Sequence, residues 1–276
     1  MVFETVVGHT KQILRIKDLI SKNLFPSSSL FVGPYGVGKK LIAFETLKEI
    51  TGSPLNVKVV GEDKPPAIDE IREISSWLFT KPQDGKGKGV IIDNADQMRS
   101  EAANALLKTL EEPPSYGFLI LISKNEGAIL PTLRSRCKIF RFGRLTDSDL
   151  ERIFERLEIP VDKRVIKLAG GSIGLALQIV NSPIPDLVKE FLELMKLNNK
   201  TLKIVSFAQN FSKLSRDEAL LFLDALENLL SQKDTILKWF EAIKRGREFL
   251  NSYAKPQSVV EWMLLEVLLK TERETF

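Results

Sequence analysis

Cysteine and histidine are nearly absent from this chain, which has one of each, Cys137 and His9, among its 276 residues. A single cysteine excludes an internal disulfide, and with one imidazole it cannot complete a zinc site built from cysteine and histidine. No apolar run approaches the ~20 residues of a membrane-spanning helix. The first residues, Met1-Val2-Phe3-Glu4, have neither the basic nor the apolar segment of a secretory signal. We therefore expect a cytoplasmic protein that holds no zinc and does not enter a membrane.

The chain also lacks a block of basic residues. Its 40 Lys and Arg against 36 Asp and Glu give a net charge of +4, a mild excess that permits contact with nucleic acid without requiring it. Hydrophobic residues make up 43% of the sequence. Because single cores stop growing near roughly 250 to 300 residues, a chain of this length is expected to form two or three domains.

One segment matches the phosphate-binding pattern G-x-x-x-x-G-K-[ST] at every defined position except the last. It reads Gly33-Pro34-Tyr35-Gly36-Val37-Gly38-Lys39-Lys40 and lies between an apolar run at 30–32 and an amphipathic helical pattern at 41–50. In such a loop, backbone N–H groups at the helix start face phosphate oxygens, so Gly33, Gly36, Gly38, Lys39 and Lys40 are the candidate nucleotide-binding residues. The ammonium of Lys40 has no lone pair for magnesium. The loop therefore keeps the backbone pattern for phosphate contacts but lacks a metal ligand. Two interpretations stay open: a nucleotide site without a metal, or a vestigial loop whose glycines only close the turn from strand to helix.

Residues 1–143 alternate strand and helix patterns in the manner of a parallel α/β domain. Segment 84–89 is predicted to be a flexible, basic, glycine-rich loop. Strands are expected at 30–32, 55–60, 90–93 and 118–122, and helices at 10–20, 41–50, 68–78 and from Ser100 to before Pro113. The pattern indicates a five-stranded nucleotide-binding sheet.

From Thr146 onward the sequence predicts helices only. Residues 144–183 are expected to form a small three-helix lid domain and residues 184–276 an all-α bundle. Capping boxes are predicted at Thr146/Asp149, Ser215/Glu218 and Ser258/Glu261, and a glycine C-cap at Gly170-Gly171. The bundle helices are expected at 186–197, 201–211, 215–231, 234–252 and 258–271.

Several motifs together resemble the AAA+ subunits of sliding-clamp loaders, and most closely the delta-prime subunits of bacterial DNA polymerase III. They are Val7-Gly8-His9, the loop at 33–40, the run 102–114 (AANALLKTLEEPP) and the run 130–137 (LPTLRSRC). The resemblance spans residues 1–180, and the order of sheet, lid and terminal bundle covers the rest. It implies an AAA+ domain over 1–143, a lid over 144–183 and an oligomerisation collar over 184–276. Many bacterial relatives also carry a four-cysteine zinc module, but residues 51–66 are short and contain no cysteine.

Three positions depart from an active member of that family. Its Walker B strand ends in Asp-Glu, whereas here it ends in Asp93-Asn94, and a carboxamide is a very poor general base. We expect Asp93 to form an ion pair with Lys40 rather than bind magnesium. The lid arginine of the motor subunits is replaced by Gly174. Coordinated loss at Lys40, Asn94 and Gly174 argues that this chain does not hydrolyse ATP.

The retained element is the Ser-Arg-Cys motif. The resemblance implies that Arg136 is an arginine finger that acts in trans on nucleotide held by a neighbouring ATPase subunit. An exposed arginine in an ordinary surface ion pair is the alternative interpretation. Cys137 beside it is expected to be a small buried hydrophobe.

The resemblance therefore implies a stator subunit of the DNA polymerase III clamp loader, which places the sliding clamp on primed DNA. Its partners would be gamma/tau-type motor subunits, the delta subunit and, through the complex, clamp and DNA. No cofactor is required, and we expect at most weak ATP or ADP binding without hydrolysis. Two alternatives stay open: an active motor subunit of the same loader, and an unrelated P-loop NTPase or kinase. On the main interpretation the chain would be no enzyme by itself, only part of a polymerase holoenzyme.

Overall fold

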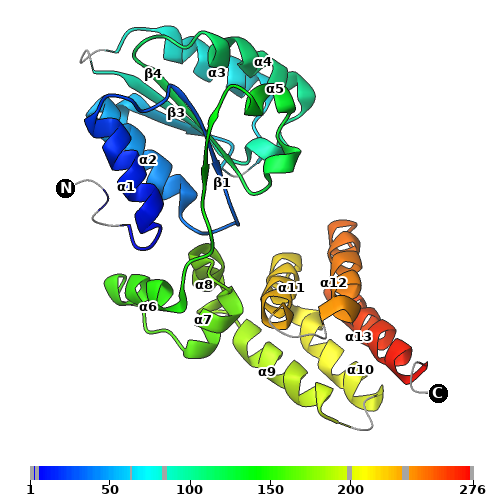
Figure 1. Cartoon of the computed structure of the whole chain (residues 1–276). Coiled ribbons are helices and arrows are strands. Elements are labelled where there is room, and N and C mark those ends of the chain that lie inside the picture. Colours follow the sequence, from blue (N-terminus) through cyan, green and yellow to red (C-terminus); the bar gives the residue numbers. More distant parts are fainter. Residues whose placement is uncertain are drawn as a thin grey trace. The chain divides into compact units, whose positions relative to one another are not determined.

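The computed structural model describes residues 3, 6–62, 64–82, 86–197, 201–231 and 236–273. The chain divides into two compact units, Met1–Asp149 and Leu150–Phe276 (Figure 1). The first is an α/β unit and the second is built of helices. Among the described residues, no helix is both long and apolar enough to cross a membrane.

A five-stranded parallel sheet forms the centre of the first unit, with the strand order β2-β3-β4-β1-β5. The sequence pattern located four of these strands, and the fifth, β5, directly follows the Ser-Arg-Cys motif. Because all strands are parallel, the segments that follow β1, β3 and β4 meet at one edge of the sheet. The strands are β1 Ser28–Val32, β2 Val57–Val60, β3 Lys88–Ile92, β4 Gly117–Ser123 and β5 Lys138–Arg141.

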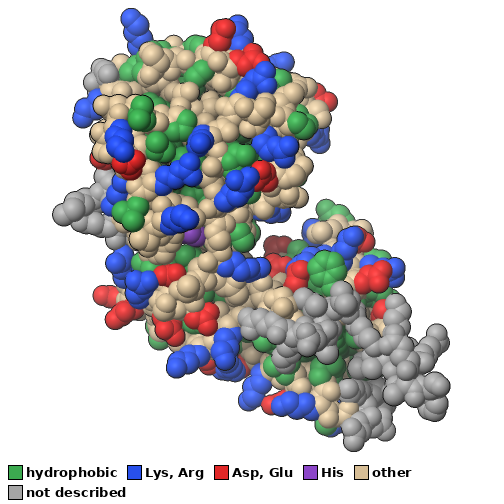
Figure 2. Space-filling view, in the orientation of Figure 1, with side chains coloured by type: hydrophobic (Ala, Val, Ile, Leu, Met, Phe, Trp, Pro, Cys, Tyr) green, Lys and Arg blue, Asp and Glu red, His purple; other side chains and the backbone are tan. Residues whose placement is uncertain are grey.

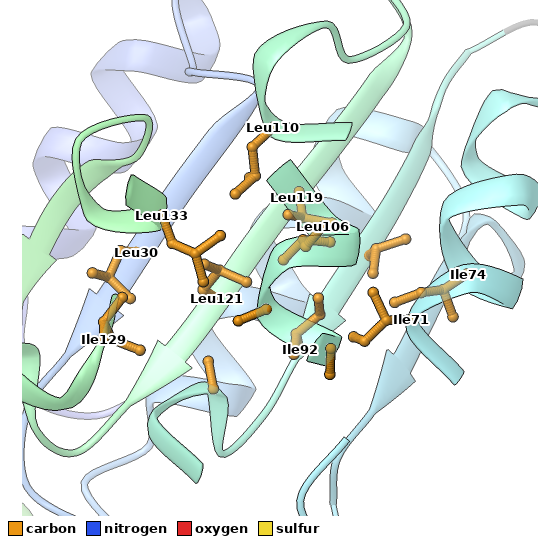
Figure 3. Close-up of a cluster of buried hydrophobic side chains, with 14 of the residues drawn as sticks. Leu30, Ile71, Ile74, Ile92, Leu106, Leu110, Leu119, Leu121, Ile129 and Leu133 are labelled. Carbon is orange, nitrogen blue, oxygen red and sulfur yellow. The ribbon is translucent and has the colours of Figure 1, made fainter. Parts of the chain in front are cut away.

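Helices cover both faces of this sheet, because successive strand residues point to opposite sides. Leu30 of β1 packs in a cluster with side chains of α3, α4 and α5 (Figure 3). Phe31, the next residue, packs with side chains of α1 and α2 on the other face. The helices are α1 Thr10–Ser21, α2 Lys39–Thr51, α3 Ile68–Phe79, α4 Ser100–Glu111 and α5 Pro131–Arg134, with short 3-10 turns η1 Pro54–Asn56, η2 Ala95–Gln97 and η3 Glu126–Ala128.

The predicted loop at 84–89 is partly wrong. Residues 84 and 85 lie outside the described residues, but Lys88 is the first residue of β3 and is only 6% exposed. Its Nζ donates to the Trp77 carbonyl oxygen at 3.0 Å and lies 4.4 Å from the centre of the Trp77 ring. The aliphatic stem of a lysine can be buried when its ammonium is hydrogen-bonded. The glycines around Lys88 indicated a loop, so the sequence did not predict this burial.

The second unit consists of short helices followed by longer ones. The capping boxes at Thr146/Asp149 and Ser215/Glu218 are confirmed by reciprocal hydrogen bonds. The third box is wrong, because Ser258 lies inside a helix that begins at Pro256. The helices are α6 Asp147–Arg156, which crosses the unit boundary, α7 Lys163–Ala169, α8 Ile173–Ile179, α9 Ile184–Met195, α10 Thr201–Gln209, η4 Asn210–Lys213, α11 Arg216–Leu230, α12 Ile236–Asn251 and α13 Pro256–Arg273.

Within the second unit, α7 is tied to α11. Gly170 caps α7 in the left-handed region, with φ 53°, as predicted. Asn228 of α11 donates to the carbonyl oxygens of Leu168 and Ala169 at 3.1 and 3.4 Å, so its side chain satisfies the end of α7. A β-carbon at Gly170 would lie 2.8 Å from Asn228 Cγ. The separation of a lid from a bundle at residue 183 stays a prediction, since both parts belong to one compact unit.

Candidate functional site

The phosphate-binding loop connects β1 to α2 in the predicted place. Gly36 and Gly38 have φ of 70° and 95°, which L side chains rarely adopt. A β-carbon at Gly38 would meet nothing within 4 Å, so the space beside it is open. No side chain caps the first turn of α2. The backbone thus has the shape of an anion-binding loop.

Lys39 is folded back into this loop. Its Nζ donates to the carbonyl oxygens of Gly33 and Pro34 at 2.7 and 2.6 Å, and the residue is 6% exposed. Burial lowers the pKa of Lys39 to about 8, against the opposing effect of Asp93 and Asp96. A buried ammonium with a lowered pKa is a poorly compensated cation, and an incoming anion would stabilise its charged form.

Lys40, in the magnesium-ligand position of the motif, is paired with two carboxylates. Its Nζ lies 2.8 Å from Glu62 Oε1 and 3.7 Å from Asp93 Oδ2. The predicted pair with Asp93 is confirmed, whereas Glu62 was not foreseen, because it follows β2 in a segment without a motif. The hydrogen bond to Glu62 raises the pKa of Lys40. An ammonium beside Asp93 leaves a donor set that does not fit magnesium, which prefers oxygen ligands in an octahedron.

Asn94 lies after β3 with its side chain turned toward the end of β2. Its Nδ2 donates to the Gly61 carbonyl oxygen at 2.8 Å, and its backbone N–H donates to Asp93 Oδ1 at 2.9 Å. Asn94 has φ 50°, which asparagine tolerates better than most residues. The Gly61 carbonyl oxygen thus takes its hydrogen bond from an amide, and an ionised glutamate at this position would have no N–H to donate.

His9 lies beside the same loop, a contact that its position near a helix start did not predict. Its Nε2 is 2.8 Å from the Val37 carbonyl oxygen, and its ring meets that of Phe142 edge-on at 5.2 Å. Burial lowers the pKa of His9. A neutral imidazole with its N–H on Nε2 can donate to Val37, so His9 holds the loop to the start of α1.

Arg136 and this loop lie at opposite ends of two neighbouring parallel strands, β5 and β1. Arg136 precedes β5, whose last residue, Arg141, pairs with Val32 at the end of β1, immediately before Gly33. β5 runs parallel to β1, so at ~3.3 Å per residue Arg136 is separated from its own loop by the length of the strand. The side chain is 35% exposed and paired with Glu111, with Nε 2.9 Å from Oε1. Arg136 cannot act on nucleotide held by its own chain.

The remaining predicted residues lie elsewhere. Cys137 packs against the cluster under α4 and α5, and burial raises its pKa to about 12, which agrees with a hydrophobic role. Gly174 is in the first turn of α8 in the second unit. Figure 2 shows Lys and Arg side chains scattered over the visible face with acidic ones among them.

Comparison with known proteins identifies the class of this fold. A structure of a variant of Thermotoga maritima RuvB matches with a TM-score of 0.50 and 16% identity, covering 78% of this chain and 75% of that one. At such low identity the match concerns the fold alone. Together with the strand order, the match shows an α/β fold of the AAA+ type followed by a helical C-terminal region.

Sequence comparisons show which proteins this chain is similar to. Residues 51–146 match a family described as "DNA polymerase III, delta subunit", and residues 148–267 match "Cyanobacterial DNA polymerase III delta prime, C-terminal domain". The replication factor C small subunit of Methanococcus vannielii is 31% identical over 191 residues, 65% of this chain and 60% of that protein. DNA polymerase III subunit tau of Bacillus subtilis is 27% identical over 283 residues, 95% of this chain and 48% of that protein. The chain thus spans about half to three-fifths of the length of these relatives, and the proteins that it resembles are subunits of DNA polymerase III and of replication factor C.

Proposed function

We propose that this chain is a delta-prime-type stator subunit of a clamp loader, which hydrolyses no ATP itself and completes the active site of a neighbouring motor subunit. The observation that carries the proposal is the pairing of Lys40 with Glu62 and Asp93. It puts a cation and a paired carboxylate where an active site would bind magnesium. Asn94 adds to this, because its amide is bonded to Gly61 and offers no base for water.

The retained arginine supports a role in trans. Arg136 is exposed at the end of the sheet opposite its own loop, as a finger toward another subunit requires. Its guanidinium would donate N–H groups to the γ-phosphate held by that neighbour and stabilise the charge that develops during transfer, an effect of about a thousandfold or more. The C-terminal family match to a delta-prime domain also favours this role.

The similarity to clamp-loader subunits suggests the partners. We propose gamma/tau-type motor subunits and a delta subunit as neighbours in a collar formed by the helices after residue 183, and the sliding clamp and primed DNA as the substrate of the complex. Neither zinc nor magnesium is required by this chain. ATP or ADP would bind its loop weakly and stay intact.

Reconstitution with motor and delta subunits tests this proposal through DNA-stimulated ATP hydrolysis. Arg136→Ala should lower turnover strongly, whereas Lys39→Ala should leave it nearly unchanged, because the loop of this chain takes no part. The opposite pattern would support the second candidate, an active motor subunit, which is favoured by the similarity to the Bacillus subtilis tau subunit over 95% of the chain.

A further inference from the structure

Two acidic residues end α4, where helix electrostatics disfavour them. Glu111 is the last residue of α4 and Glu112 its C-cap, followed by two prolines. The C-terminal end of a helix carries partial negative charge, so acids there are unfavourable. A residue that breaks a local rule often serves a contact elsewhere, and Glu111 makes such a contact.

Glu111 holds one edge of the Arg136 guanidinium. Both Nε and Nη2 of Arg136 donate to Glu111 Oε1, at 2.9 and 2.5 Å. Nη1 donates to the Thr132 carbonyl oxygen at 2.9 Å and lies 3.4 Å from Ser135 Oγ. All three nitrogens are therefore fixed, although the side chain lies at the surface.

The guanidinium still has donors to offer. An arginine has five N–H groups, and Glu111 and Thr132 take three of them. Among the described residues, one N–H of Nη2 has no acceptor and one of Nη1 has only the long contact to Ser135. These two N–H groups belong to the terminal nitrogens, Nη1 and Nη2. An anion can therefore bind at the outer end of the guanidinium while Glu111 stays bonded to Nε and Nη2.

We propose that Glu111 is a positioning residue for the Arg136 finger, an inference that rests on the proposed function of Arg136 in trans. The carboxylate holds the guanidinium in one rotamer with its outer edge free for a phosphate of the neighbouring subunit. Ordering a rotamer-rich side chain corresponds to about two- to tenfold in an equilibrium. The opposing effect, partial neutralisation of the finger by an exposed carboxylate, is small because water screens such pairs.

The test uses the reconstituted complex and steady-state ATP hydrolysis. Glu111→Ala should lower kcat about two- to tenfold with KM for ATP unchanged, since the residue acts only on orientation. Glu111→Gln keeps an acceptor oxygen, so its kcat should fall less than that of Glu111→Ala. Glu112→Gln is the matched control, an exposed acid one residue along, and should retain wild-type turnover. In the Arg136→Ala background, Glu111→Ala should have no further effect.

A second measurement uses the full chain alone. The Arg136 Nε–H resonance should be protected from exchange with water in the wild type and in Glu112→Gln, and lose that protection in Glu111→Ala. Loss of turnover with Arg136→Ala but not with Glu111→Ala would overturn the positioning role and leave the finger intact. If Arg136→Ala itself changed nothing, the proposed function would fail. Faster turnover with Glu111→Ala would mean that the carboxylate restrains the finger, and would overturn the inference.

Discussion

Asn94 donates from its side-chain amide to the carbonyl oxygen of Gly61 at 2.8 Å. The bond joins the turn after β3 to the end of β2, two segments that the chain brings together through the parallel pairing of these strands. The position where an active relative would have glutamate is therefore used here for a structural hydrogen bond. Restoring an acid at this site would remove the donor and leave a carbonyl oxygen without its partner.

Asn94→Asp should lower the free energy of unfolding by about 1–3 kcal/mol, because an isosteric carboxylate cannot donate to Gly61 and also lies beside Asp93. Urea denaturation followed by circular dichroism measures this. Asn104→Asp makes the same chemical change at an exposed position of α4 and should stay within about 0.5 kcal/mol of wild type. Equal stability of Asn94→Asp and wild type would show that the Gly61 contact contributes little.

Lys40→Ser should make ATP binding sensitive to magnesium. The substitution frees the Asp93 carboxylate and adds a hydroxyl, which gives a metal two oxygen ligands. We expect magnesium not to strengthen ATP binding by the wild type and to strengthen it in the variant, measured by calorimetry with magnesium and with a chelator. Lys48→Ser, on the same helix, pairs only with Glu45 among the described ion pairs and serves as the control. Magnesium-dependent ATP binding by the wild type would contradict the inference that the Lys40 ammonium prevents magnesium from binding at this site.

Lys39 should make stability depend on pH in an alkaline window. Its pKa is lowered from 10.5 to about 8 in the folded chain by burial, so between these values the unfolded chain binds more protons. The free energy of unfolding therefore gains a contribution as pH rises from 8 toward 10.5. Lys39→Met should lose this gain, measured by urea denaturation at several pH values.

Lys40→Met is the control for that experiment. The hydrogen bond to Glu62 raises the pKa of Lys40 in the folded chain. The contribution of Lys40 to the free energy of unfolding is therefore fully present below pH 10.5, and it is lost only as the pH rises through the pKa of the folded chain. Between pH 8 and 10.5, the difference in free energy of unfolding between Lys40→Met and the wild type should therefore stay constant. A difference between Lys39→Met and wild type that does not change with pH would contradict the low pKa of Lys39.

Cys137 should react slowly with thiol reagents while the chain is folded. Burial raises its pKa to about 12, and the thiolate is the reactive form. Because the chain has one cysteine, the release of chromophore from Ellman's reagent reports this residue alone. Reaction should speed up greatly in denaturant. An exposed thiol introduced by Ser135→Cys in a Cys137→Ala chain should react at the rate of a free thiol, and equal rates for the two chains would refute the burial argument.

The sheet, the loop and most helices were predictable because their signals are local. The glycine spacing at 33–40 defines a turn, and strand and helix periodicities extend over neighbouring residues. Even so, the start of α13 was misplaced: Ser258 and Glu261 fit a capping box, but Pro256 is suited to the first helical turn and the helix begins there.

The side-chain contacts around the site were harder to predict from the sequence. Lys40–Glu62, Asn94–Gly61 and Arg136–Glu111 join residues 22, 33 and 25 positions apart. Each depends on strand register and on the path of a connecting segment, which a motif does not encode. The Lys40–Asp93 pair was predicted because both residues belong to motifs that meet at one sheet edge. Glu62 belongs to none.

Asn228 of α11 donates hydrogen bonds to carbonyl oxygens at the end of α7, about 60 residues earlier in the chain. Withdrawing α11 would leave the Leu168 and Ala169 carbonyl oxygens without these partners. The last turn of α7 should therefore open only when α11 detaches, and amide exchange would register the two helices as one cooperative unfolding unit.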